Sequence, residues 1–261
     1  MKKIALGILA VVAMTGSAFA ADMAPRYTKA PVAAPIVTYN WTGCYLGGNV
    51  GGGWHRVDQV ANTNSALVPF VPPLALGAGD GSEFIGGVQV GCDYQFAGNW
   101  VIGVQGMFDF GNINSRNNVP DGRLPGFYTT TRTRDIYTGT ARLGYLFAPQ
   151  VLGYVKGGGA WTNTYTQFFG TIPATFQSQF ASSDRSGWTV GGGLEWMFAP
   201  GWSVFGEYNY MDFGRKDVLF TAAPGTIGLP SINSTKLTVQ TALVGVNYKF
   251  NFGGAPLVAK Y

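Results

Sequence analysis

The chain has 261 residues, of which 39 are glycine, 15% are aromatic and only 11% are charged. Ordinary soluble domains carry about 25% charged residues and about 7% glycine, and glycine on this scale disfavours a helical protein. The formal net charge is +4 and no basic cluster or stripe stands out, so we expect no nucleic-acid partner.

Residues 1–20 are predicted to be a secretory signal peptide. Lys2 and Lys3 form its charged region, residues 4–14 its apolar core, and residues 18–20 (Ala-Phe-Ala) its small-x-small cleavage site. No other stretch approaches 18 consecutive apolar residues, the length that a membrane helix needs. A closed β-barrel is then the only structure with which the mature chain could cross a membrane.

Residues 21–40 follow the signal and contain three prolines among alanine and valine. This composition predicts an extended periplasmic tether that acts as a spacer, with binding of a periplasmic component as the alternative.

The next segments alternate apolar and polar side chains, which indicates strands with one apolar and one polar face. The clearest is 84–96, where the even positions are apolar or small and Gln89, Asp93 and Gln95 occupy odd positions. The predicted strands are about 43–56, 83–97, 99–110, 132–147, 151–168, 185–198, 202–214 and 235–250.

The connections between these strands are predicted to alternate strictly between short and long. The short ones are 97–99, 148–150 and 199–201. The long ones, rich in Asn, Pro, Gly, Ser and Thr, are 57–82, 111–131, 169–184 and 215–234. Such alternation is typical of an up-and-down barrel with both termini and all tight turns at one rim, because outer-membrane barrels have short periplasmic turns and longer extracellular loops.

Aromatic residues near the strand ends fit the girdles that sit at lipid head-group depth. The candidates are Tyr45, Trp54, Trp100, Trp161, Trp202 and Tyr248. Together these patterns predict an all-β fold over residues 41–261, an eight-stranded antiparallel up-and-down transmembrane β-barrel.

Three motifs point to a known family. They are Trp41-Thr42-Gly43-x-Tyr45-x-Gly47, the run 206–214 (GEYNYMDFG) and the run 245–250 (GVNYKF). Their set and order resemble the small outer-membrane β-barrel family of alphaproteobacteria, surface and immunogenic proteins related to OmpA-type barrels. The resemblance implies an eight-stranded outer-membrane barrel with surface loops and an envelope-structural or porin-like role, without catalysis.

Inward-facing positions of the predicted strands carry charges of both signs. They are Glu83, Asp93, Asp109, Arg142, Lys156, Glu195, Glu207 and Lys249. Eight strands enclose a space just wide enough for side chains to fill, so we expect these charges to pair inside a filled interior. The alternative is a narrow conducting lumen whose charged ring selects ions.

Cys44 and Cys92 are the two cysteines of a chain that we expect to be exported, which invites a disulfide. Both fall on the apolar phase of their strands, at ends that an antiparallel hairpin would bring to the same rim. Two small lipid-facing side chains are the equally weighted alternative.

The last predicted strand carries an alternating pattern that fits an assembly signal for the outer membrane, at Val244, Val246, Tyr248 and Phe250. In many members of the resembling family the aromatic of the last strand ends the chain, whereas here the chain continues to Tyr261. Either Phe250 or Tyr261 could therefore be presented to the assembly machinery.

His55 is the only histidine and the only candidate base for a serine hydrolase, with Asp58 nearby. No serine lies in a nucleophile-elbow motif, so we expect no catalytic residues, no cofactor site and no metal site. Haem capture by His55 with loop tyrosines is a further alternative.

We expect a non-enzymatic protein of the outer membrane, with long loops outside the cell and termini in the periplasm. Its partners would be outer-membrane lipids and lipopolysaccharide, the barrel-assembly machinery and periplasmic chaperones. Its role would be structural support and surface presentation, with slow passage of small solutes. Alternatives are an adhesion or ligand-binding barrel, a lipid-modifying enzyme, and a soluble barrel with an apolar lumen.

Overall fold

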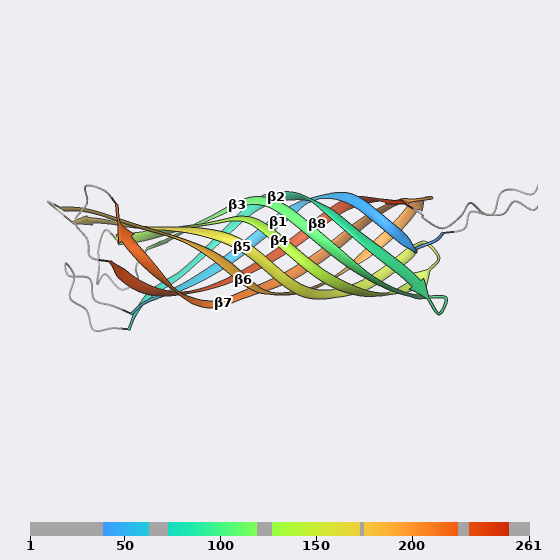
Figure 1. Cartoon of the computed structure of the whole chain (residues 1–261). Helices are drawn as coiled ribbons and strands as arrows, with labels where there is room; N and C mark the ends of the chain where they lie inside the picture. The colour runs from blue at the N-terminus through green and yellow to red at the C-terminus, as the bar shows by residue number, and fades with distance from the viewer. Residues whose placement is uncertain (1–38, 63–72, 119–126, 173–174, 224–229, 251–261) are drawn as a thin grey trace, which may run out of the picture. The chain divides into compact units, whose positions relative to one another are not determined.

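The computed structural model describes residues 39–62, 73–118, 127–172, 175–223 and 230–250. Eight antiparallel strands form a closed barrel in which each strand pairs with its sequence neighbours and the last pairs with the first (Figure 1). They are β1 (Gly43–Ala61), β2 (Leu74–Phe96), β3 (Trp100–Asn118), β4 (Phe127–Ala148), β5 (Val151–Ile172), β6 (Thr175–Ala199), β7 (Trp202–Ala222) and β8 (Ser231–Phe250). The predicted fold class is confirmed. The predicted signal peptide, all but the last two residues of the tether, and Tyr261 lie outside the described residues.

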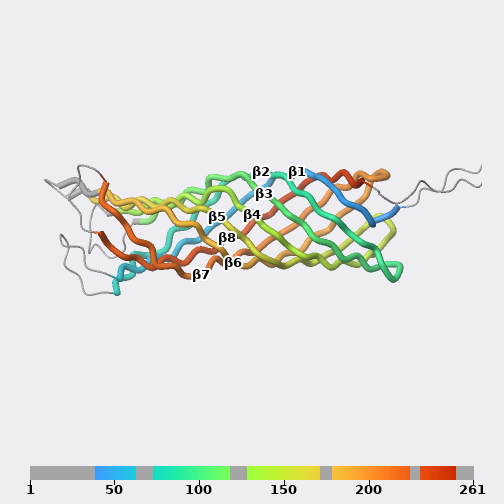
Figure 2. Tube along the Cα trace, in the orientation of Figure 1, coloured from blue at the N-terminus to red at the C-terminus, as the bar shows by residue number. Residues whose placement is uncertain are grey.

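Closure of the barrel depends on the pairing of β1 with β8. Their register runs without interruption from Cys44 opposite Phe250 to Ala61 opposite Asn233. Since every strand has a partner on both sides, none is left as a free edge strand of the kind that would be costly in lipid. The strands wind obliquely around the barrel, as the trace in Figure 2 shows.

The two rims of the barrel differ. Residues 97–99, 149–150 and 200–201 connect strands at one rim, which we call the turn end, where β1 begins and β8 ends. The opposite rim is called the loop end. Among the described residues, no helix is long and apolar enough to span a membrane.

The strands are longer than their hydrophobic pattern predicted, and this corrects the loop assignments. Much of 57–82, 111–131, 169–184 and 215–234 continues the strands toward the loop end. Only residues 173–174 separate β5 from β6, so the strict alternation of short and long connections is wrong there.

The reason is that the regular alternation of apolar and polar side chains breaks down in these extensions, where several inward positions are polar. Thr129 and Thr131 of β4, for example, both point inward and are buried. Threonine is β-branched and fits a strand well, so the backbone pairing continues although no apolar phase marks it.

The outer wall over the middle of the barrel is apolar. Its large side chains stand exposed, among them Val104 (60%), Leu194 (60%) and Val244 (58%). Five of the six aromatic residues predicted for the girdles, Trp54, Trp100, Trp161, Trp202 and Tyr248, are exposed on this wall. The assignment of Tyr45 is wrong, because it alternates with the exposed Leu46 and is 1% exposed inside the barrel.

The interior is layered rather than uniformly polar. Along β4, from the turn end, the inward side chains run from Leu146 through Arg142 and Ile136 to Thr133. Three apolar clusters follow one another in this direction. The first contains Trp41, Val101, Leu146, Leu152, Tyr154 and Met197. The second contains Val57, Ile85, Met107, Ile113, Ile136, Ala160, Met211, Phe213, Leu237, Val239 and Leu243. The third contains Ala181, Val218 and Phe220.

Candidate functional site

The most elaborate polar structure is a set of charged side chains between the first and second apolar clusters. We call it the interior charge network; it consists of Asp93, Arg142, Lys156, Glu195, Glu207 and Lys249. All six are at most 5% exposed, and three carboxylates face three cations, so their formal charges cancel. Alternation along the strands places them here, since each lies on the inward phase of its own strand.

Arg142 is the centre of one half of the network. Its Nε donates to Asp93 Oδ1 at 2.7 Å, its Nη2 donates to the other Asp93 oxygen, and its Nη1 donates to Glu195 Oε2 at 3.1 Å. The guanidinium also lies 4.8 Å from the ring centre of Tyr45 and 5.1 Å from that of Tyr154. Bidentate pairing of arginine with a carboxylate and stacking on aromatic rings both hold its planar group in one orientation.

Lys249 joins this half of the network to the turn end. Its Nζ donates to Asp93 Oδ2 at 2.7 Å and to the backbone carbonyl of Trp41 at 3.0 Å. The second carboxylate, Glu195, accepts from Ser203 Oγ at 2.6 Å and from Asn247 Nδ2 at 3.0 Å. Each of these buried charges thus has several hydrogen-bonding partners, as the cost of burying it requires.

The other half of the network is built around Glu207. It accepts from Lys156 Nζ at 2.6 Å, Asn209 Nδ2 at 2.9 Å and Tyr154 Oη at 2.8 Å. Lys156 also donates to Gln105 Oε1 at 3.0 Å. With Gln105 on β3 and Tyr45 on β1, all eight strands contribute side chains to this layer.

Trp41 closes the turn end beneath the network. Its side chain is fully buried against the first apolar cluster and donates from Nε1 to the carbonyl of Pro149 at 3.1 Å. Its backbone N–H donates to Gln95 Oε1 at 3.2 Å, and Lys249 Nζ lies 4.8 Å from its ring centre. The tryptophan that precedes the first strand therefore blocks the mouth of the barrel.

Two of the eight predicted interior charges have other surroundings. Glu83 is exposed; the β2–β3 register ends at Gly86 opposite Phe110, so no paired strand covers it on that side. Asp109 is buried, with 1% exposure, but neither of its carboxylate oxygens has a hydrogen-bond partner among the described residues.

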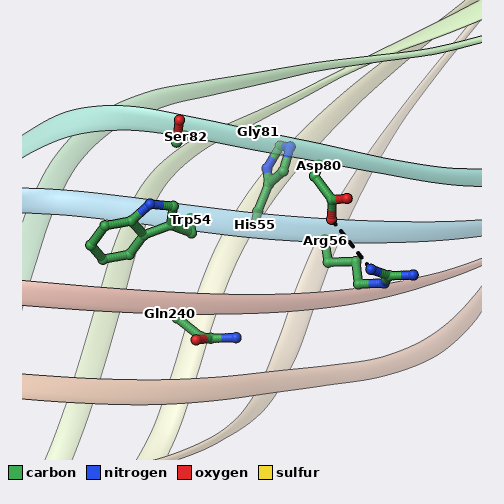
Figure 3. Close-up of a pocket in the computed structure, with 7 residues that line it drawn as sticks. All are labelled: Trp54, His55, Arg56, Asp80, Gly81, Ser82 and Gln240. Carbon is green, nitrogen blue, oxygen red and sulfur yellow. Dashed lines mark ion pairs between the residues drawn. The ribbon is translucent and has the colours of Figure 1, made fainter.

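His55 lines a pocket of about 480 Å³ on the barrel wall (Figure 3). The other lining residues are Trp54, Arg56, Asp80, Gly81, Ser82 and Gln240. The His55 ring is 3% exposed and its Nδ1 lies 2.7 Å from Thr133 Oγ1. Asp58 pairs with Arg56 instead, at 3.5 Å, so the described residues contain no serine, histidine and carboxylate joined in a relay.

A second polar layer lies toward the loop end, beyond the central apolar cluster. Arg185 is its charged member, and it donates to Thr164 Oγ1 at 3.3 Å and to the carbonyl and hydroxyl of Thr235. Gln59 Nε2 donates to Thr131 Oγ1 at 3.2 Å in the same layer. Among the described residues, no group of three His, Cys, Asp or Glu side chains could hold a metal ion.

Cys44 and Cys92 lie directly opposite each other on β1 and β2 and form a disulfide.

The residues predicted to form the assembly signal all point outward near the turn end, with Val244, Val246, Tyr248 and Phe250 between 40% and 58% exposed. Their recognition during assembly stays a prediction.

Three residues were not assigned their interior roles from the sequence, namely Trp41, Tyr45 and Tyr154. Trp41 and Tyr45 belong to the motif that opens the first strand, which marked them as notable without indicating an inward role. Tyr154 could have been found from its phase, because it lies two residues before Lys156 on the same face.

Known proteins similar to this chain are found by sequence and by structure. The model of a family described as "Outer membrane protein beta-barrel domain" matches residues 6–250. The 31 kDa outer-membrane immunogenic protein of Brucella melitensis biotype 1 is 29% identical over 254 residues, covering 96% of this chain and 100% of the relative. The 25 kDa outer-membrane immunogenic protein of Brucella abortus biovar 1 is 26% identical over 255 residues, covering 96% and 99%.

Two solved structures of outer-membrane proteins are also similar to this chain, at low TM-scores. The outer membrane protease OmpT from Escherichia coli has a TM-score of 0.45 at 9% identity and covers 83% of this chain and 99% of its own. A major outer membrane protein from Thermus thermophilus has a TM-score of 0.45 at 12% identity and covers 76% and 99%.

Proposed function

Because this chain belongs to the outer membrane protein beta-barrel family, we propose that it is a closed barrel that supports the cell envelope and presents its loop end at the cell surface. The chain is an outer-membrane β-barrel protein related to immunogenic outer-membrane proteins.

The observation that carries the proposal is the occupation of the interior by paired side chains. The interior charge network is formally neutral, is hydrogen-bonded among side chains of β2 to β8, and lies between two apolar clusters. A conducting lumen needs a continuous aqueous path lined by sites that an ion can enter and leave. From the turn end, the first apolar cluster with Trp41, the interior charge network and the second apolar cluster fill the barrel one after another. This filling argues for a plugged interior rather than a pore.

The orientation follows from the two rims. Outer-membrane barrels place their short turns in the periplasm and their longer loops outside. We therefore place the turn end, with Trp41 and the disulfide, at the periplasmic side. The loop end then faces the surroundings of the cell. The assembly machinery would meet the outward residues of β8 from the periplasmic side.

Conductance in planar bilayers tests the plug directly. We expect purified wild-type protein to show no steady single-channel conductance, whereas barrels with an aqueous lumen conduct under the same conditions. Folding is checked beforehand by heat-modifiable gel migration. Steady channels in the folded wild-type protein would contradict the proposal and favour slow passage of small solutes.

Proteolysis of intact cells tests the orientation. We expect added protease to cut between strands at the loop end and to leave the turn-end connections intact. Cleavage at 97–99 or 149–150 in intact cells would show the opposite orientation.

A further inference from the structure

Three arginines gather on the outer wall near the loop end. Arg116 lies on β3, and Arg132 and Arg134 lie on β4; all three are exposed. The residues that alternate with them, such as Ser115 and Thr133, are buried in the interior, so the arginines point away from the barrel.

The β3–β4 register brings these arginines together. Arg132 is opposite Asn114 and Arg134 is opposite Asn112, while Arg116 follows two residues after Asn114. Diagonal neighbours of this kind in an antiparallel pair lie about 7–8 Å apart. Arg116 and Arg132 are such neighbours and Arg134 lies two residues beyond Arg132, so the three arginines line one stretch of the outer wall, which we call the basic patch.

The arginines of the patch are not paired with the acidic residues around them. None of its arginines forms an ion pair with any described residue, whereas Arg56, exposed on the same outer wall, lies within 3.7 Å of both Asp58 and Asp80. The adjoining strand β5 has no acidic residue between Thr162 and Ile172. Asp135 of β4 is next to Arg134 in the chain and Asp80 of β2 lies beside Arg116, but neither forms an ion pair with an arginine of the patch. Like charges held together without a partner are costly, which points to an anionic ligand.

The position of the patch identifies where that ligand would lie. On the side toward the middle of the barrel, the same two strands carry the outward Phe108, Phe110 and Tyr137. The rings of Phe108 and Tyr137 stack at 4.4 Å. Aromatic residues of this kind lie at head-group depth. The arginines follow immediately toward the loop end, at the height of lipid phosphates rather than of acyl chains.

We propose that Arg116, Arg132 and Arg134 bind the phosphate groups of lipopolysaccharide in the outer leaflet of the outer membrane. Guanidinium groups match phosphate by paired hydrogen bonds and are weakly hydrated, so arginine is suited to this contact. Arg116 is already oriented, because its guanidinium carbon lies 3.9 Å from the ring centre of Tyr128. This inference rests on the proposed function for the direction in which the loop end faces.

The test compares folded proteins in non-ionic detergent, titrated with purified lipopolysaccharide. The triple variant Arg116→Gln, Arg132→Gln and Arg134→Gln is expected to bind about tenfold more weakly than the wild type, since three exposed charge-assisted contacts are lost together. The control Arg56→Gln removes an outer-wall arginine that is already paired, and is expected to bind like the wild type. Heat-modifiable gel migration confirms that each variant is folded, and the single variant Arg132→Lys is expected to show a smaller loss.

Two further ligands identify the chemical group that is recognised. Lipopolysaccharide stripped of its lipid A phosphates is expected to bind the wild type as weakly as the triple variant binds the intact molecule. The inference is overturned if the folded triple variant binds lipopolysaccharide as tightly as the wild type does. It is also overturned if the wild type binds dephosphorylated lipopolysaccharide, or phosphatidylglycerol micelles, as tightly as it binds intact lipopolysaccharide. Because binding is measured on purified protein, this result is independent of the orientation, which proteolysis of intact cells decides separately.

Discussion

At the scale of single residues, burial alone does not say what a charge contributes. Asp93 and Asp109 both point inward and are both at most 5% exposed. Asp93 accepts hydrogen bonds from Arg142 and Lys249, whereas Asp109 accepts none from any described residue. The change in stability on removing either carboxylate should therefore depend on its hydrogen-bonding partners and not on its burial.

We expect Asp93→Asn to lower the free energy of unfolding by about 3–5 kcal/mol, because Arg142 and Lys249 stay buried and charged but lose the carboxylate that they share. Asp109→Asn is expected to leave that free energy unchanged or raise it by about 1–3 kcal/mol, since it removes a buried carboxylate that forms no ion pair. Urea titrations of the folded protein in lipid, followed by gel migration, measure both values. Equal destabilisation by the two substitutions would contradict this account.

Gly91 shows why one inward position must lack a side chain. A Cβ there would collide with the hydroxyl of Tyr45 and would lie 2.7 Å from the backbone carbonyl oxygen of Val104. At Gly206, in contrast, a Cβ would meet nothing within 4 Å.

We expect Gly91→Ala to lower the free energy of unfolding by about 1–3 kcal/mol, as overpacked substitutions in close-packed interiors do. Gly206→Ala is the matched control and is expected to be neutral or slightly stabilising, because it only reduces the freedom of the unfolded chain. The same urea titrations compare the two variants, and a larger loss for Gly206→Ala would refute the packing argument.

At the scale of the strands, the first hairpin contains the only disulfide among the described residues. The disulfide between Cys44 and Cys92 joins paired positions of β1 and β2 at the turn end and spans a sequence separation of 48 residues. Such a link restricts the unfolded chain more than the folded one.

We expect replacement of both cysteines by serine to lower the free energy of unfolding by about 2–4 kcal/mol and to leave the folded barrel closed. Urea titration of the double variant, beside the wild type with and without reductant, measures this effect. The reduced wild type should match the double variant; if reductant has no effect on the wild type, the link does not stabilise the protein.

At the scale of the whole molecule, the interior is blocked more than once. Trp41 closes the turn end, the interior charge network follows, and the second apolar cluster lies beyond it. Loss of one layer should therefore not open the barrel.

We expect Trp41→Ala to remain non-conducting in planar bilayers, although it should lower stability by about 3–5 kcal/mol through the cavity that it leaves. Conductance measured beside the wild type checks the first expectation and urea titration the second. Steady conductance of the single variant would show that Trp41 is the only barrier and that the layers beyond it are permeable.

The outcome of the sequence predictions depended on what alternation can reveal. Strand number, the inward position of Asp93 or Lys249, and the outward position of Leu194 all follow from a period of two, which is a local property of the chain. Tyr45 was assigned to the outer girdle from its residue type, whereas its alternation with the outward Leu46 places it inside. The predicted β5 and β6 were too short, because apolar and polar residues do not alternate regularly in the outer parts of these strands.

The amino-acid order by itself determined that this chain forms eight two-faced strands in an outer-membrane barrel, since that requires only a repeating contrast between neighbouring residues. Tertiary structure alone decided which charges meet. The partners Arg142 and Asp93, the cap formed by Trp41, and the approach of Arg116 to Arg132 all depend on strand register and barrel closure. Those properties arise from pairing between distant segments, and a one-residue shift would change every one of these contacts.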